Sequence, residues 1–96
     1  MIQSFADQTA ADLFDERNSK QARKVPKDIW RAAQRKMKML DVAARLEDLK
    51  APPGNRFEEL KGPLKGRYSV RVNNQYRMTF RWENGNAFDV AIEDYH

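Results

Sequence analysis

Apolar side chains recur at intervals of three and four residues between positions 26 and 49, which is the spacing of one face of a helix. Pro26 suits the first position of such a helix, because its missing N–H would have no partner there. The run APPGN at 51–55 ends the helix, and residues 41–50 either continue it or form a separate short helix. The predicted buried stripe contains Ile29, Ala33, Met37, Leu40 and Ala44.

The first fourteen residues carry two shorter signals. Apolar side chains at Ile2 and Phe5 with polar neighbours indicate a short opening strand. Residues 10–14 predict a short helix, and either Asp7 or Thr9 provides a side chain that can cap its first turn.

After residue 55 the apolar period changes to two, the period of a β-strand. Asn73-Asn74-Gln75 and Asn84-Gly85 are predicted turns, because Asn and Gly tolerate positive φ. Helices followed by an antiparallel meander are typical of the α+β class. We predict one domain over residues 1–96, with N-terminal helices on one face of a small, mainly antiparallel sheet. The expected strands are 57–60, 67–72, 76–82 and 88–93.

Alternation gives these strands an apolar side and a polar side. The apolar side should pack under the helices, with Phe88 in step with Val90 and Ile92 on the last strand. The other members of this side are Val70, Val72, Tyr76, Met78, Phe80 and Trp82. The polar side collects four arginines, Arg67, Arg71, Arg77 and Arg81.

Charge is unevenly distributed along the chain, whose net charge is +4. Residues 17–40 hold nine Lys/Arg against one acid, and residues 61–81 hold six Lys/Arg and no acid. Two basic blocks of this kind fit an anionic partner, most commonly a nucleic acid. They fit an ordinary solvated surface equally well, so charge alone leaves both interpretations open.

Composition excludes several other classes of site. The chain has no cysteine and one histidine, so disulfides, thiolate metal sites and histidine metal cages are excluded, and we predict no metal and no cofactor. No apolar run reaches the length of a membrane span, and the N-terminus lacks the features of a signal peptide. We therefore expect a cytoplasmic protein without a membrane partner.

Side chains that can transfer protons lie close in the sequence to the strands that carry the arginines. Lys61 lies at a turn, and Tyr95 and His96 follow the last strand. Guanidinium groups bind phosphate oxygens in pairs, while a phenol and an imidazole can move protons. Together they suit the attack of an RNA 2′-hydroxyl on its neighbouring phosphate. Walker-type glycine loops and serine–histidine–acid patterns are absent from the sequence.

Four segments also resemble a known family: MIQSFAD, PPGNRFEELKG, YSVRVNNQYRMTFRW and the terminal VAIEDYH. In this order and spacing they resemble the HigB branch of the RelE/ParE toxin superfamily, the toxins of bacterial type II toxin–antitoxin systems. The resemblance implies helices packed on one side of a twisted antiparallel sheet. It also implies a ribosome-dependent mRNA endonuclease that cuts in the A site through the 2′-hydroxyl, without a metal.

The resemblance carries over to particular residues. It assigns catalysis to Lys61, Arg77, Tyr95 and His96, and RNA contacts to Arg71, Asn73 and Asp94, which the alternation extends to Arg67 and Arg81. Some family members carry a histidine where this chain has Glu58 or Glu59, so His96 is the only imidazole here. The hypothesis is that Arg77 and Lys61 neutralise the scissile phosphate while His96, helped by Tyr95, transfers protons.

The resemblance further implies partners. These are a HigA-like helix-turn-helix antitoxin, the 70S ribosome with its mRNA, and operator DNA only through the antitoxin. The basic block at 17–38 would then dock on ribosomal RNA. Two alternatives stay open: a non-enzymatic ParE-like inhibitor of DNA gyrase, and a degenerate toxin that acts only as an antitoxin-bound co-repressor.

Overall fold

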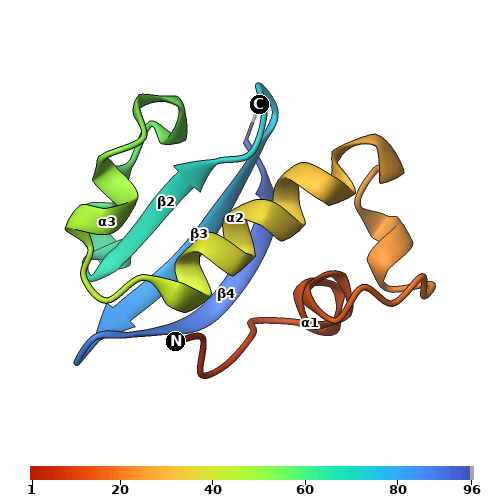
Figure 1. Ribbon diagram of the computed structural model, residues 1–96, viewed down its shortest axis with the longest axis horizontal. Helices are drawn as coiled ribbons and strands as arrows, with labels where there is room; N and C mark the ends of the chain where they lie inside the picture. Colours follow the sequence, from red (N-terminus) through yellow and green to blue (C-terminus); the bar gives the residue numbers. More distant parts are fainter. Residues whose placement is uncertain (96) are drawn as a thin grey trace.

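The computed structural model describes residues 1–95, with helices covering one face of a four-stranded antiparallel sheet (Figure 1). The strands lie in the order β1-β2-β3-β4, so each pairs with its neighbour in the chain. This arrangement confirms the predicted α+β class. The strands are β1 Glu58–Glu59, β2 Arg67–Arg71, β3 Tyr76–Glu83 and β4 Asn86–Asp94. The helices are α1 Gln8–Phe14, α2 Trp30–Val42 and α3 Glu47–Lys50, with 3-10 turns η1 Ala22–Lys24, η2 Lys27–Ile29, η3 Pro53–Asn55 and η4 Gly62–Leu64.

The long predicted helix is divided at both ends. Its first residues form η2, in which the Ile29 N–H donates to the Pro26 carbonyl at 3.1 Å, so α2 begins four residues later than predicted. At the other end Ala43 is extended, and the Asp48 carboxylate accepts the N–H groups of Ala44 and Arg45 at 2.9 and 3.1 Å. The separate short helix, one of the two alternatives, is therefore correct.

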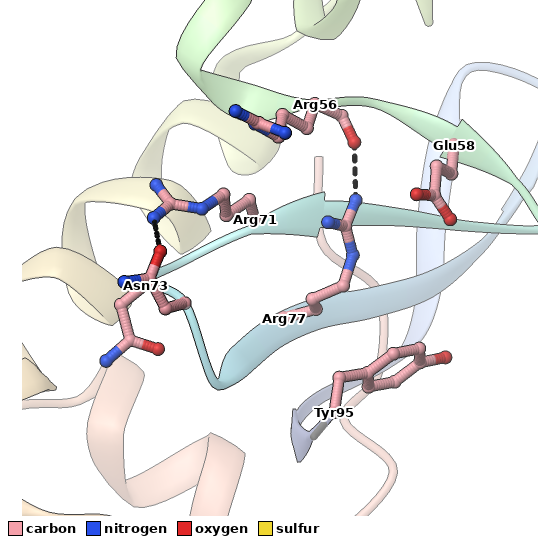
Figure 2. A pocket seen from close by; sticks show the side chains of 7 residues that line it. Arg56, Glu58, Arg71, Asn73, Arg77 and Tyr95 are labelled. Carbon is pink, nitrogen blue, oxygen red and sulfur yellow. Dashed lines mark hydrogen bonds between the residues drawn. The ribbon is translucent and has the colours of Figure 1, made fainter.

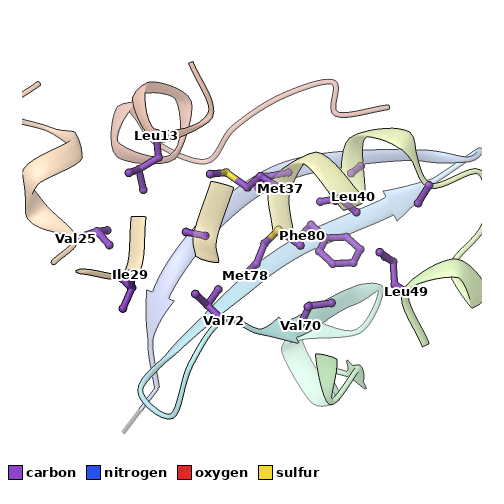
Figure 3. Close-up of a cluster of buried hydrophobic side chains, with 14 of the residues drawn as sticks. Leu13, Val25, Ile29, Met37, Leu40, Leu49, Val70, Val72, Met78 and Phe80 are labelled. Atoms are coloured by element: carbon purple, nitrogen blue, oxygen red, sulfur yellow. The ribbon is translucent and has the colours of Figure 1, made fainter. Parts of the chain in front are cut away.

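The core lies between α2 and the sheet, where the two predicted apolar stripes meet (Figure 3). Met37 and Leu40 of α2 and Met78 and Phe80 of β3 are fully buried. Truncating one of them, as in Leu40→Ala, would cost about 2–5 kcal/mol of unfolding free energy.

A β-bulge in β4 changes the predicted alternation. Asp89 has φ +55°, and the register shifts by one residue between Thr79 and Arg81 of β3. Ala87 and Val90 are fully buried, whereas the Phe88 ring lies 4.6 Å from the Arg81 guanidinium carbon. The prediction that Phe88 shares the core side with Val90 is wrong, because the extra residue of the bulge reverses the alternation.

The opening segment lies beside β4, as Figure 1 shows. Ile2 and Phe5 form parallel bridges to Ala87 and Val90, and the Ile2 N–H donates to Asp41 Oδ1 at 2.8 Å. The N-terminal residues thus cover part of an otherwise open sheet edge.

Candidate functional site

The face of the sheet opposite the helices carries the four arginines in two cross-strand pairs. Arg71 pairs with Arg77, and Arg67 pairs with Arg81. Between these pairs lie Ser69 and Thr79, opposite one another and fully buried. The arginine face therefore has two ends separated by small side chains.

One end holds a cavity of about 330 Å³. Six segments contribute to it: the residue after η3, the strands β1, β2 and β3, the β2–β3 turn, and the residue after β4 (Figure 2). Its lining residues are Arg56, Glu58, Arg71, Asn73, Asn74, Arg77 and Tyr95.

Arg77 is held in place from two sides. Its Nε donates to the Ser69 hydroxyl at 2.8 Å, and its Nη2 donates to the backbone carbonyl of Arg56, with the Ser69 carbonyl at 3.4 Å. Arg56 has φ +44° in the turn that follows η3. Among residues 1–95 the Nη1 amino group has no hydrogen-bond partner, so the anchored guanidinium presents one edge to the cavity.

The loop that carries Arg56 is tied to α2 through Asn55. This fully buried amide donates to the Leu49 carbonyl at 3.0 Å and accepts a hydrogen bond from the Lys36 ammonium. Partial burial lowers the pKa of Lys36, and the positive charges of Arg35 and Arg71 lower it further. Lys36 thus stands in a positively charged region that extends from α2 to the cavity.

Two side chains of the β2–β3 turn complete this end of the cavity. Asn73 Oδ1 accepts the N–H groups of Gln75 and Tyr76 at 2.9 and 2.7 Å, which stabilises the turn. Asn74 Oδ1 accepts a hydrogen bond from Arg71 Nη2.

Acidic side chains reach the arginine face from the neighbouring strands. Glu58 of β1 lies opposite Ser69 and lines the cavity, and Glu93 of β4 lies opposite Arg77 and accepts a hydrogen bond from the Thr79 hydroxyl. The arginine face of the folded sheet therefore contains acidic side chains, although residues 61–81 contain none. Three of the lining residues are not among the predicted site residues: Arg56, Glu58 and Asn74.

Comparisons with known proteins agree with this fold and with the quoted motifs. Residues 3–96 match the family described as the RelE-like toxin of type II toxin-antitoxin system HigB. The chain belongs to this HigB-like toxin family. The predicted family is therefore confirmed.

Individual relatives are consistent with the assignment. The toxin is 41% identical to Toxin HigB-1 of Vibrio cholerae serotype O1 over 93 residues, which cover 97% of this chain and 96% of the relative. It is 39% identical to Endoribonuclease HigB of Proteus vulgaris over 41 residues, 43% of this chain and 45% of the relative. The YoeB–YefM toxin–antitoxin complex from Staphylococcus aureus contains a chain of the same fold, with a TM-score of 0.61 at 18% identity, covering 100% of this chain and 98% of that one.

Four predicted site residues of the toxin do not line the cavity: Lys61, Arg67, Arg81 and Asp94. Lys61 is exposed before η4. Arg81 ion-pairs with Glu83 and, at 3.4 Å, with Asp89, while Arg67 donates to the Asp89 carbonyl at 3.4 Å. The two arginines at this end of the sheet are therefore engaged with neighbouring residues.

The C-terminal residues end β4 beside the β2–β3 turn. Tyr95 lines the cavity with 41% of its surface exposed, and its N–H donates to the Gln75 carbonyl. Asp94 accepts a hydrogen bond from the Gln75 amide at 3.2 Å. His96 lies outside the described residues, so its predicted role stays a prediction.

The toxin has a second basic cavity on α2, of about 360 Å³. Arg31, Gln34, Arg35 and Lys38 line it together with Glu16, which ion-pairs with Lys38 at 3.4 Å.

No group of three or more His, Asp or Glu side chains in residues 1–95 has a geometry suited to a metal ion. In the same residues, no helix is both long and apolar enough to cross a membrane.

Proposed function

We propose that this toxin is an endoribonuclease that cuts mRNA in the ribosomal A site. The observation that carries the proposal is the anchored Arg77 guanidinium, which faces a cavity shared with Glu58 and Tyr95. The name of the Proteus vulgaris relative, Endoribonuclease HigB, supports the same chemistry.

The proposed reaction is attack by the 2′-oxygen on the adjacent phosphorus, without a metal, as the family resemblance implies. A base takes the 2′-hydroxyl proton, the new P–O bond forms, the bond to the 5′-oxygen breaks, and that oxygen receives a proton. The products are a 2′,3′-cyclic phosphate and a 5′-hydroxyl. Charge builds up on the phosphate oxygens in the transition state, which a fixed guanidinium stabilises because it needs no reorientation.

Roles follow from position in the cavity. Arg77 neutralises the phosphate, with Arg71 as its helper. Glu58, a carboxylate in the same cavity, joins His96 as a candidate base, and Tyr95 assists proton transfer. Lys61 remains a proposed second cation that would approach only in the ribosomal complex.

Docking on the ribosome is assigned to the basic block at 17–38. Its cavity on α2 offers Arg31, Arg35 and Lys38 to phosphate oxygens of ribosomal RNA. Such contacts are independent of base sequence and weaken as salt concentration rises. We further propose a HigA-like helix-turn-helix antitoxin as the neutralising partner, as the family resemblance implies. The YoeB–YefM toxin–antitoxin complex supports an antitoxin partner in general.

The test is translation of a defined mRNA on purified ribosomes, followed by mapping of the mRNA ends. Wild-type toxin should cut within the A-site codon, and Arg77→Gln should not, although it folds. Intact mRNA would overturn the proposal. If DNA supercoiling by gyrase were inhibited instead, the toxin would be ParE-like, and if neither process changed, a role as co-repressor would remain.

A further inference from the structure

The cations of the main cavity are unequally placed around Arg77. Figure 2 shows the Arg56 and Arg71 guanidinium groups on one side of Arg77, and Glu58 and Tyr95 on the other side. All five residues line the same cavity. The cavity thus has a cationic end, defined by Arg56 and Arg71, and an end that contains the proton-transfer candidates.

No acidic side chain of residues 1–95 forms an ion pair with the cationic end. Within residues 1–95, the Arg56 guanidinium has no hydrogen-bond or ion-pair partner, and Arg71 uses only one amino group, toward the neutral Asn74. Arg81, on the same face of the sheet, differs from them because it pairs with two carboxylates. Like charges held near one another without a counterion favour the binding of an anion.

The surroundings of the cationic end are held in place by hydrogen bonds and carry positive charge. Lys36 reaches it from α2, and its lowered pKa has the charge of Arg71 among its causes, after burial and Arg35. The bond from Lys36 to the buried Asn55 holds the loop that precedes Arg56. The guanidinium groups are forked donors, a geometry that matches two oxygens of one phosphate.

We propose that Arg56 and Arg71 bind a second phosphate group, so that the cavity holds two successive phosphates of one RNA strand. The first is the scissile phosphate at Arg77, and in this respect the inference rests on the proposed function. The second lies on the side of Arg77 opposite Glu58 and Tyr95. The cavity would therefore recognise the strand through its backbone, on one side of the cleaved bond.

The test uses dinucleotides whose 2′-hydroxyl groups are methylated, so that they bind without being cut. Affinities are measured by NMR titration for a dinucleotide with its single internal phosphate and for the two forms that carry an additional 5′- or 3′-phosphate. One of the two additional phosphates should raise the affinity about tenfold. It should also steepen the dependence of log affinity on log salt by about 0.7.

Variants assign the gain to residues. Arg56→Gln should remove most of the gain and leave the affinity for the singly phosphorylated dinucleotide unchanged. Arg71→Gln should also remove most of the gain, and because Arg71 assists Arg77 at the first phosphate it should weaken binding of the singly phosphorylated dinucleotide as well. Arg77→Gln should weaken binding of both. The matched control is Lys65→Gln, which removes one positive charge from an exposed turn and should retain the full gain. Thermal unfolding establishes that each variant is folded.

The proposal is overturned if neither additional phosphate raises the affinity, or if the gain survives in both Arg56→Gln and Arg71→Gln. An equal loss for all three dinucleotides in Arg56→Gln would also overturn it, because Arg56 would then act on the first phosphate. Since no cleavage is measured, these outcomes are separate from the ribosome experiment, whose failure would leave a two-phosphate site without nuclease activity.

Discussion

Ser69→Ala tests whether Arg77 must be held in one position in order to act. The substitution removes only the hydroxyl that accepts the Arg77 Nε hydrogen at 2.8 Å. It leaves both backbone carbonyls that lie near Nη2, those of Arg56 and Ser69. Ser69 is fully buried, and alanine is smaller, so the strand should accommodate the change without a clash.

The expected magnitude follows from the burial of the two groups. A hydrogen bond that involves a charged donor contributes about 1.5–3 kcal/mol when it is buried. Arg77 is only half-buried, so water replaces part of the bond, and the unfolding free energy should fall by about 1 kcal/mol. Cleavage should slow by about ten- to a hundredfold, because a guanidinium with one anchor instead of two is poorly oriented toward the phosphate.

Urea denaturation and single-turnover cleavage on programmed ribosomes measure the two effects. The maximal rate should fall while the toxin concentration for half-maximal rate stays unchanged, because docking uses another surface. A double-mutant cycle with Arg77→Gln should give a coupling free energy of about 1 kcal/mol. A folded Ser69→Ala variant that cleaves within about twofold of the wild-type rate would refute the positioning role.

Three further predictions concern stability and the arginine face. The Asp12 carboxylate accepts bonds from the Ser19 hydroxyl at 2.6 Å and the Gln8 amide at 2.7 Å, which lower its pKa. The stabilisation by the ionised Asp12 is complete above the ordinary aspartate pKa of about 3.9 and is lost as pH falls through the lower folded-state pKa. In Asp12→Ala, the unfolding free energy measured by urea denaturation should therefore decrease less steeply as pH is lowered through this range. Asn55→Ala should lower the unfolding free energy by about 1–3 kcal/mol in urea denaturation, because it leaves the Leu49 carbonyl without its donor; an unchanged midpoint would contradict this. Arg81→Gln should slow cleavage less than Arg71→Gln does, since Arg81 already pairs with two carboxylates; equal losses in parallel rate measurements would contradict the division of the arginine face.

Regular alternation made most of the sheet predictable. In 67–72 and 76–82 the apolar positions recur with period two over enough residues to define a face, and Val70, Met78 and Phe80 are buried as expected. The start of the long helix was less predictable, because Pro26 is compatible with a 3-10 turn as well as with an α-helix. The reversal at Phe88 depends on a bulge for which the sequence has no glycine signal.

The cavity was predictable only in part, because its residues come together through pairing of distant segments. Arg77 and Tyr95 followed from motifs shared with the family. Glu58 belongs to a two-residue strand, too short to show any alternation, so its direction depends on the pairing with Ser69. Arg56 enters the site through a turn with positive φ that no pattern in the sequence marks.

The bulge at Asp89 also determines which side chains the end of β4 presents to each face. The hairpin turn pairs Glu83 with Asn86, and if β4 contained Asp89 but no bulge, the same register would place Val90 opposite Thr79 and Ile92 opposite Arg77. The apolar side chains of β4 would then point into the cavity, and Glu93 and Tyr95 would point toward the helices. Deleting Asp89 removes the extra residue itself, so Val90 would lie opposite Phe80, and Ala91 would stay opposite Thr79 in a regular β4. The core and the cavity should then both be retained, which urea denaturation and cleavage rates would check. The bulge thus compensates for the register set by the β3–β4 turn and places Tyr95 on the cavity side of the sheet.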